Sequence, residues 1–166
     1  KNKFKQFIAI IFSQIYMIYF SLVIIFYLIG NFEAHKYLIF FLLTICISTD
    51  IGGFVFGKTI GGKKLTKISP NKTYSGLVGS FVTSILTGYI FFVMNPNLVY
   101  ININIFVLIF LLSLISQIGD LAISLLKRIG KIKDTGSILP GHGGLLDRID
   151  GILLTLPFGI IIITYV

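Results

Sequence analysis

The aspartates are the residues of this sequence most clearly suited to metal binding or catalysis, because they lie in an otherwise apolar chain. Asp120 lies within the run SLISQIGDLAISLL, where a carboxylate at membrane depth costs about 2.5 to 3.5 kcal/mol and is expected to face a polar interior. Asp147 and Asp150 are spaced i, i+3, so on a helix they share one face. Mg²⁺ prefers such oxygen ligands. The pattern predicts a magnesium site formed by Asp120, Asp147 and Asp150.

Simpler explanations compete for the carboxylates within apolar segments. The Asp120 side chain can extend to the membrane interface or pair with Lys127 two turns further on. Asp50, near the end of an earlier apolar run, is open to the same explanation. The neighbouring Ser48 and Thr49 can simply hydrogen-bond to the helix backbone.

A glycine- and lysine-rich segment, GKTIGGKKLTKISPNKTYSG (residues 57–76), lies between two apolar runs. Its glycines permit close backbone approach, its lysines suit phosphate, and a helix start near Ser75 favours anions. It resembles a phosphate cradle, although the pattern GxxxxGK[ST] is absent. Binding of anionic lipid headgroups explains the segment equally well.

The segment KDTGSILPGHGGLLDRID, residues 133–150, interleaves aspartates with cations. A positive-inside bias accounts for the cations but not for the aspartates. His142 has no His or Cys neighbours that would complete a zinc site, so it contacts phosphate or stabilises the loop. Metal-binding acids beside Lys and Arg indicate phosphoryl or nucleotidyl transfer, with a lipid as one substrate.

The elements that position these residues are expected to be membrane-spanning helices. The 166 residues are 55% hydrophobic and only 12% charged, about half the charged fraction of a typical soluble domain. Because a span needs about 20 residues, five are predicted, at about 7–29, 37–56, 77–94, 98–126 and 152–166. We therefore expect an all-α, polytopic integral membrane bundle, with 1–166 as a single transmembrane domain.

The charge distribution predicts the orientation of these spans. With five alternating spans, 13 of the 14 Lys and Arg residues lie on one side, and only Lys36 lies opposite. By the positive-inside rule that side is the cytoplasm, here the inner face of a bacterial membrane, and the active site lies there. The net charge of +8 is thus explained without nucleic acid.

The N-terminal apolar run has a second interpretation as a cleavable signal peptide, because three lysines precede it. The run is longer than a typical signal and lacks a small-residue cleavage pattern, so a true span is favoured. The chain does not begin with Met, which leaves open whether further N-terminal spans precede it.

The run SLLKRIGKIKDTGSILPGHGGLLDRID, residues 124–150, resembles the signature of the CDP-diacylglycerol synthases, also called phosphatidate cytidylyltransferases. Every fixed position of that signature is filled. The segments QIGDL (117–121), KISPNKTYSG (67–76) and DIGGFVFGK (50–58) resemble family segments in the same order. The likeness covers roughly residues 45–166, the catalytic part. Tyr74 and Ser75 depart from it, because the family usually has Trp and an acidic or amide residue there.

The resemblance implies that CTP and phosphatidate give CDP-diacylglycerol and pyrophosphate with Mg²⁺, for phospholipid biosynthesis. It places metal at Asp120 and Asp147, with Asp150 in support, and implies K⁺ as a second cation and a homodimer. Phosphates would be neutralised by the catalytic cations Lys127, Arg128 and Arg148, and by Lys133. The other substrate-binding residues that it suggests are Lys58, Ser69, Lys72, Thr73, Asp134, His142, Gly143 and Gly144.

Two other functions fit parts of the same pattern. A CTP-dependent kinase of a polyprenol or similar lipid alcohol also needs a nucleotide site at the inner face. An ion-coupled transporter also places aspartates within the membrane. A transporter more naturally shows internal repeats, which this sequence lacks, and here the acids gather at one face.

Overall fold

The computed structural model describes residues 11, 15–16, 18–25, 27, 29, 32–66, 69, 71–98, 101–131 and 150–165, the side chains of 32–34 excepted. Within these residues the chain is helical and no strand is formed, which confirms the predicted all-α class. A single antiparallel bridge joins Lys64 and Thr73. In chain order the elements are α2 (Phe32–Thr59), α3 (Tyr74–Met94), the short 3₁₀ helix η1 (Pro96–Leu98), α4 (Ile105–Ile129) and α5 (Asp150–Tyr165).

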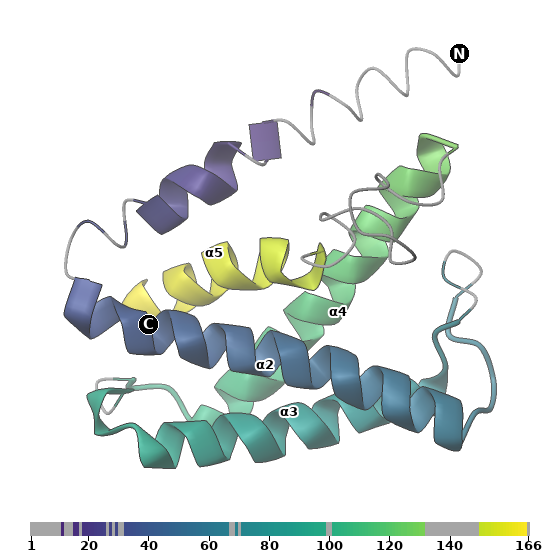
Figure 1. Ribbon diagram of the computed structural model, residues 1–166, viewed down its shortest axis with the longest axis horizontal. Coiled ribbons are helices and arrows are strands. Elements are labelled where there is room, and N and C mark those ends of the chain that lie inside the picture. Colours follow the sequence, from purple (N-terminus) through teal and green to yellow (C-terminus); the bar gives the residue numbers. More distant parts are fainter. Residues whose placement is uncertain are drawn as a thin grey trace, which may run out of the picture.

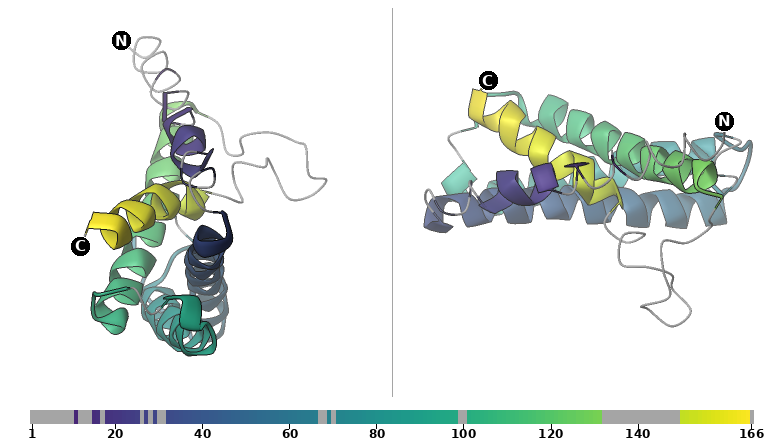
Figure 2. Two further views of the ribbon diagram at one scale, coloured as in Figure 1. Left: turned by 90° about the vertical axis from the view of Figure 1, so that its left-hand side faces the viewer. Right: turned by 90° about the horizontal axis from the view of Figure 1, so that it is seen from above.

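Helices α2 and α3 lie side by side and run in opposite directions, as Figure 1 shows. Helix α4 crosses behind them at a steep angle, and α5 packs against α4 and α2. Seen nearly along α2 and α3, in the left view of Figure 2, these two helices form one side of the bundle and α4 and α5 the other. The loop between α2 and α3 lies at the same end of the bundle as the C-terminus of α4 (Figure 1).

Three of the described helices are long and apolar enough to cross a membrane: His35–Thr59, Tyr74–Met94 and Ile105–Ile129. They agree with the second, third and fourth predicted spans. Helix α5 is apolar but has 16 residues, fewer than the roughly 20 that a perpendicular span needs. The described residues of the first predicted span are helical. The protein is an all-α membrane bundle.

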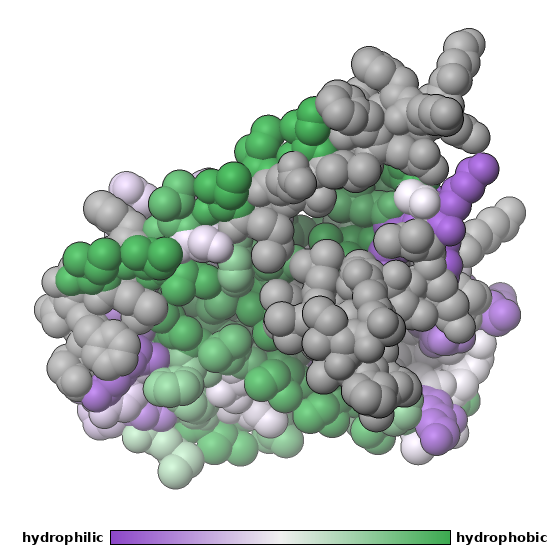
Figure 3. All heavy atoms as spheres, turned by 45° about the horizontal axis from the view of Figure 1, so that its top comes forward, coloured by the Kyte–Doolittle hydropathy of each residue, from purple (hydrophilic) through white to green (hydrophobic). Residues whose placement is uncertain are grey.

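The outer surface of the bundle is apolar. On α3, Val78, Val82, Leu86 and Val93 are all more than half exposed and follow one another along the helix at near-helical spacing. Figure 3 shows hydrophobic residues over the middle of one face and hydrophilic residues toward its ends. Such a surface is stable in lipid, because lipid tails are as apolar as these side chains.

The start of the fourth helix differs from its prediction. The apolar run suggested a start at about residue 98, but α4 begins at Ile105. The Asn104 side chain accepts hydrogen bonds from the backbone N–H groups of Phe106 and Val107, at 3.0 and 3.4 Å, and so caps the helix. The preceding residues 96–98 form η1 instead. A local cap therefore sets the boundary that hydrophobicity alone placed seven residues too early.

Close packing of α2 against α3 depends on glycine. A Cβ atom at Gly52 would lie 1.9 Å from Thr83 Oγ1 and 2.7 Å from the backbone oxygen of Gly79. At this crossing Thr83 Oγ1 donates to the Ser48 carbonyl at 2.9 Å. Small residues and hydroxyl groups are the usual means by which helices associate in membranes, where hydrophobic driving force between them is weak.

The apolar core lies in the part of the bundle formed by the first half of α2, the first half of α4 and the second half of α5. Its fully buried members on α2 and α4 are Leu38, Phe41, Leu42, Ile45, Leu108, Ile109 and Leu112. The other half of the bundle, beside the α2–α3 loop, is left for polar residues.

A proline in α5 creates a specific hydrogen-bonding need. Pro157 has no N–H, so the Leu153 carbonyl one turn earlier lacks its helical donor. The Tyr16 hydroxyl, from the N-terminal part of the chain, donates to that carbonyl. The hydroxyl therefore satisfies a backbone group that would otherwise be unpaired within the membrane, where each such group is costly.

Tyr16→Phe is expected to destabilise the protein by about 1 to 2 kcal/mol, because the Leu153 carbonyl loses its donor. In a Pro157→Ala background the helix supplies its own N–H, so the same change should cost less than about 0.5 kcal/mol. Unfolding in mixed detergent measures this double-mutant cycle. Tyr19→Phe, in the same segment and on a side chain that is 41% exposed, is the control. Equal costs in both backgrounds would contradict the assignment.

Candidate active site

A cavity of about 360 Å³ lies where the polar ends of the helices meet, beside the α2–α3 loop. Its volume is within the range of small-molecule sites. It draws residues from α2, the loop, α3, α4 and the first turn of α5. The lining residues are Thr49, Asp50, Gly53, Phe54, Leu65, Ser69, Asn71, Lys72, Thr73, Gly76, Leu77, Ser80, Gln117, Asp120 and Asp150.

The loop between α2 and α3 folds back on itself and brings Lys72 to this cavity. The Leu65 N–H donates to the Lys72 carbonyl at 2.8 Å, and the Tyr74 N–H donates to the Lys63 carbonyl at 3.2 Å. Near the turn, the Lys72 N–H donates to the Ser69 carbonyl at 3.1 Å. Gly61 and Gly62 have positive φ angles of 65° and 109°, which suit glycine where the chain leaves α2.

Thr73 is the N-cap of α3, immediately after Lys72. Its hydroxyl accepts from the Gly76 N–H at 3.1 Å and lies 2.9 Å from Ser75 Oγ. Capping therefore already employs the Thr73 hydroxyl. The N-terminus of α3 nevertheless faces the cavity, since Thr73 and Gly76 both line it. A helix N-terminus in this position favours an anion.

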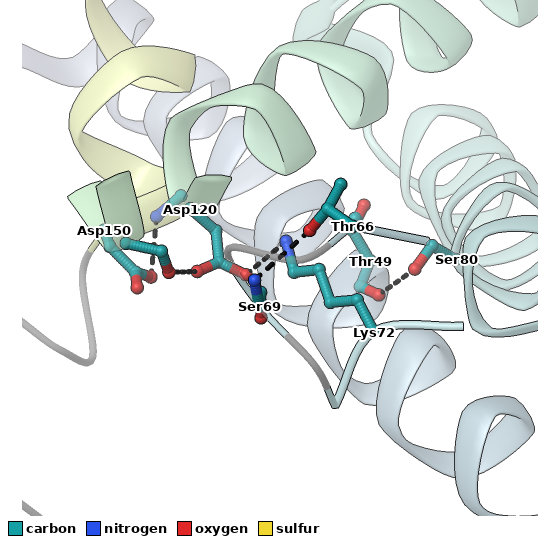
Figure 4. A network of polar contacts seen from close by, with 9 residues as sticks. Thr49, Thr66, Ser69, Lys72, Ser80, Asp120 and Asp150 are labelled. Atoms are coloured by element: carbon teal, nitrogen blue, oxygen red, sulfur yellow. Dashed lines mark hydrogen bonds and ion pairs between the residues drawn. The ribbon is translucent and has the colours of Figure 1, made fainter. Parts of the chain in front are cut away.

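The Lys72 ammonium pairs with the Asp120 carboxylate across the cavity, at 2.5 Å between Nζ and Oδ2 (Figure 4). Ser124, one turn further along α4, donates to Asp120 Oδ1 at 3.4 Å. The Lys72 and Asp120 side chains are 25% and 26% exposed, so the pair is accessible from the cavity. The prediction that Asp120 faces a polar interior is confirmed, and its partner is Lys72.

Asp150 reaches the same cavity because α4 and α5 cross closely next to it. A Cβ atom at Gly119 would lie 3.1 Å from the Asp150 carbonyl oxygen and 3.3 Å from that of Gly151. Asp120 and Asp150 directly adjoin these two glycines, so the crossing brings both carboxylates to the cavity (Figure 4). Asp150 Oδ1 accepts from the Gly151 N–H at 2.9 Å, at the start of α5.

The described lining carries three carboxylates, of Asp50, Asp120 and Asp150, against one ammonium, of Lys72. This excess of negative charge in a partly enclosed space favours a bound cation. An all-oxygen donor set fits Mg²⁺ in chemical type. Among the described residues, however, no group of three or more acidic, His or Cys side chains is close enough to hold a metal ion. The described part of the cavity thus offers part of a magnesium site.

Five of the predicted site residues line the cavity together: Ser69, Lys72, Thr73, Asp120 and Asp150. Three other predicted residues do not line it. The Lys58 ammonium lies 5.6 Å from the centre of the Phe54 ring, and Lys127 and Arg128 lie in the last turn of α4. The predicted residues outside the described part of the chain are Lys133, Asp134, His142, Gly143, Gly144, Asp147 and Arg148.

Sequence reasoning did not assign several of the lining residues to the site. From the sequence, Asp50 is explained as an isolated carboxylate near a helix end, and Asn71 has no assigned role. Gln117 was overlooked as a site residue, although it precedes Asp120 by three residues and so shares its helix face. That spacing was the signal by which it could have been found.

Fold and cavity together define a class, the membrane proteins whose charged and hydrogen-bonding groups meet in one cavity of a helix bundle. Comparison with known protein families identifies the family within this class. The chain belongs to the cytidylyltransferase family, whose model matches residues 1–166.

The chain is also similar to individual bacterial proteins named phosphatidate cytidylyltransferase. It is 43% identical to that of Bacillus subtilis (strain 168) over 122 residues, which cover 72% of this chain and 45% of the relative. It is 44% identical to that of Brucella suis over 118 residues, covering 69% and 42%, and 43% identical to that of Rickettsia bellii over 129 residues, covering 74% and 56%. The chain therefore spans about half the length of these relatives.

Proposed function

We propose that the protein transfers CMP from CTP to phosphatidate, giving CDP-diacylglycerol and pyrophosphate for phospholipid synthesis. Membership of the cytidylyltransferase family and the names of the similar proteins support this reaction. The observation that carries the proposal is the meeting of Lys72, Asp120 and Asp150 in one cavity. It joins groups that bind phosphate to groups that bind a cation, in a bundle that lies in the membrane where the lipid substrate resides.

In this reaction a phosphate oxygen of phosphatidate attacks the α-phosphorus of CTP. The bond from the α-phosphorus to the α,β-bridging oxygen breaks, and pyrophosphate leaves with that bonding electron pair. The attacking oxygen is already anionic near neutral pH, so no strong general base is required. The protein has to position the two phosphates and stabilise the negative charge, which is the main task in phosphoryl transfer.

Lys72 and the N-terminus of α3 are the described groups suited to the phosphates. The Lys72 ammonium is held beside the cavity by Asp120, and the first residues of α3 line the same wall. On substrate binding the ammonium exchanges part of its contact with Asp120 for a phosphate oxygen. The predicted contributions of Lys127, Arg128, Lys133 and Arg148 to phosphate neutralisation remain predictions, as do the substrate contacts of Lys58, Asp134, His142, Gly143 and Gly144.

Asp120 would hold Mg²⁺ together with Asp147, the second predicted ligand in the segment before α5, and Asp150 would support them. When bound, Mg²⁺ supplies charge neutralisation and orientation of the phosphate oxygens. Asp50 adds to the negative charge of the same cavity. K⁺ as a second cation and a homodimer are further predictions of the family resemblance.

We also propose that the protein is multi-pass, with the cavity on the cytoplasmic face. The cavity lies beside the α2–α3 loop, which carries four of the lysines, and beside the basic last turns of α2 and α4. The positive-inside rule assigns such loops to the cytoplasm. CTP is then available to the cavity from the aqueous side, and phosphatidate from the adjoining leaflet.

The proposed function is tested by following pyrophosphate release by purified protein in mixed micelles with CTP and Mg²⁺. Pyrophosphate should appear only when phosphatidate is present, in a one-to-one ratio with the lipid product. Replacing phosphatidate with a polyprenol or with diacylglycerol is the matched control and should give no release. Turnover with a lipid alcohol, with CDP as the soluble product, would replace the proposal by a CTP-dependent lipid kinase.

A further inference from the structure

Gln117 is a cavity-lining residue for which the reaction outlined above has no role. It lies at the middle of α4, three residues before Asp120, and so about 4.5 Å further into the bundle along the helix axis. One turn earlier on the same helix, Ser113 Oγ accepts a hydrogen bond from Thr49 Oγ1 at 3.0 Å. Gln117 therefore lies between this neutral contact and the Lys72–Asp120 ion pair.

The amide nitrogen of Gln117 is buried and has no hydrogen-bond acceptor among the residues that the structure describes. Leaving such a donor unsatisfied costs about 1 to 3 kcal/mol. Neighbouring uncharged groups of the cavity are engaged, since the Thr49 hydroxyl donates to Ser113 and the Ser80 hydroxyl donates to the Thr49 carbonyl at 2.7 Å. Ser116 Oγ is also buried without a partner in the described part, but Ser116 does not line the cavity.

The position of Gln117 indicates which part of a nucleotide it meets. Phosphates carry the charge of CTP and belong with Lys72, the α3 N-terminus and a cation, at the level of Asp120. The base is neutral, and it is the part that is least costly to place further inside a membrane bundle. Cytosine presents the acceptors O2 and N3 beside the N4 amino donor, and a glutamine amide offers an NH₂ donor beside an oxygen acceptor.

We infer that Gln117 recognises the cytosine base of CTP, its amide NH₂ donating to the O2 and N3 edge. The inference rests on the proposed function only in naming CTP as the nucleotide. It gives the cavity two levels: a charged level around Asp120, which holds the phosphates, and a neutral level around Gln117, which holds the base.

The test compares the binding of CTP with that of inorganic tripolyphosphate, which has the phosphates but no base. Affinities are measured by titration calorimetry on purified protein with Mg²⁺. Gln117→Leu should weaken CTP binding about tenfold or more and leave tripolyphosphate binding within twofold of wild type. Gln117→Glu, which keeps the shape but replaces the donor with an acceptor oxygen, should weaken CTP binding at least as much.

Ser116→Ala is the matched control, because it removes the other buried polar atom that has no partner in the described part, without altering the cavity lining. It should leave both affinities unchanged.

Equal losses of CTP and tripolyphosphate affinity in the Gln117 variants would place the amide on a phosphate and overturn the inference. Unchanged CTP affinity in the Gln117 variants, together with a lower melting temperature, would show that Gln117 has only a structural role. Equal affinities of the wild-type protein for CTP and tripolyphosphate would also contradict base recognition. Preferential CTP binding by a wild type that makes no CDP-lipid would reject the proposed reaction alone.

Discussion

Asp120→Asn is expected to lower kcat for CMP transfer at least about a hundredfold while the protein stays folded. The change keeps the size of the side chain but removes the charge that pairs with Lys72 and that would help to hold Mg²⁺. The Lys72–Asp120 contact is partly exposed, so its loss should change stability by no more than about 1 kcal/mol. Initial rates at saturating CTP and phosphatidate, with a thermal unfolding curve for each variant, measure both quantities.

A double variant distinguishes two roles of Asp120. If the carboxylate served only to balance the Lys72 ammonium, then removing both charges in Lys72→Met/Asp120→Asn would restore much of the lost activity. We expect no recovery, because Asp120 also acts on the substrate phosphates through the cation that it would bind. Lys36→Met, a lysine predicted to lie on the other side of the membrane, controls for the loss of a positive charge and should retain wild-type turnover. Asp120→Asn turnover within threefold of wild type would contradict the assignment.

Gly52→Ala should have the largest effect on stability, a loss of about 1 to 3 kcal/mol. The added methyl would lie 2.7 Å from the Gly79 backbone oxygen, which cannot move without separating α2 from α3. That separation would also disturb the loop that carries Lys72. The gain in helix propensity from glycine to alanine is at most about 1 kcal/mol and does not offset the overlap.

Gly88→Ala is the matched control for Gly52→Ala, since it makes the same change at a buried helical glycine, on α3 instead of α2. There a Cβ atom would lie 3.1 Å from Ile109 Cδ1 and 3.2 Å from Ile45 Cγ1, which are side-chain atoms that need to move by only a few tenths of an ångström, and no backbone atom is as close. We expect Gly88→Ala to change stability by less than about 0.5 kcal/mol, as the helix propensity gained offsets slight crowding. Unfolding midpoints in a detergent titration compare the two, and equal losses would show that the crossing at Gly52 is not specially tight.

The helices were largely predictable from sequence, because hydrophobic runs of membrane length leave few alternatives. Residues 37–56 and 77–94 correspond closely to α2 and α3. The start of α4 was not predictable from hydropathy, since residues 98–104 are apolar except for Asn102 and Asn104, and the Asn104 cap sets the first residue of the helix. Capping is a local hydrogen-bonding effect to which a hydropathy profile is insensitive.

The site was predictable as a set of residue types but not as a set of contacts. Asp120 and Lys72 were each identified, one by its cost in an apolar helix and the other by its place in a glycine-rich loop. Their pairing was not, because it depends on the fold of the α2–α3 loop and on the packing of α4 against α2 and α3. Lys127 was a partner for Asp120 only under the simpler explanation of that carboxylate. The ion pair that the structure places at Asp120 is formed by Lys72, which is remote in sequence.

The most direct measurement of the central claim follows two differently labelled CTP molecules into the lipid product. Purified protein is incubated with phosphatidate, Mg²⁺ and CTP that carries ³²P at either the α or the γ position, and the lipids are extracted. Transfer of CMP predicts that label from the α position enters the lipid fraction, that label from the γ position leaves as pyrophosphate, and that Asp120→Asn abolishes the lipid label. Label from the γ position in the lipid, with none from the α position, would contradict nucleotidyl transfer and identify a kinase.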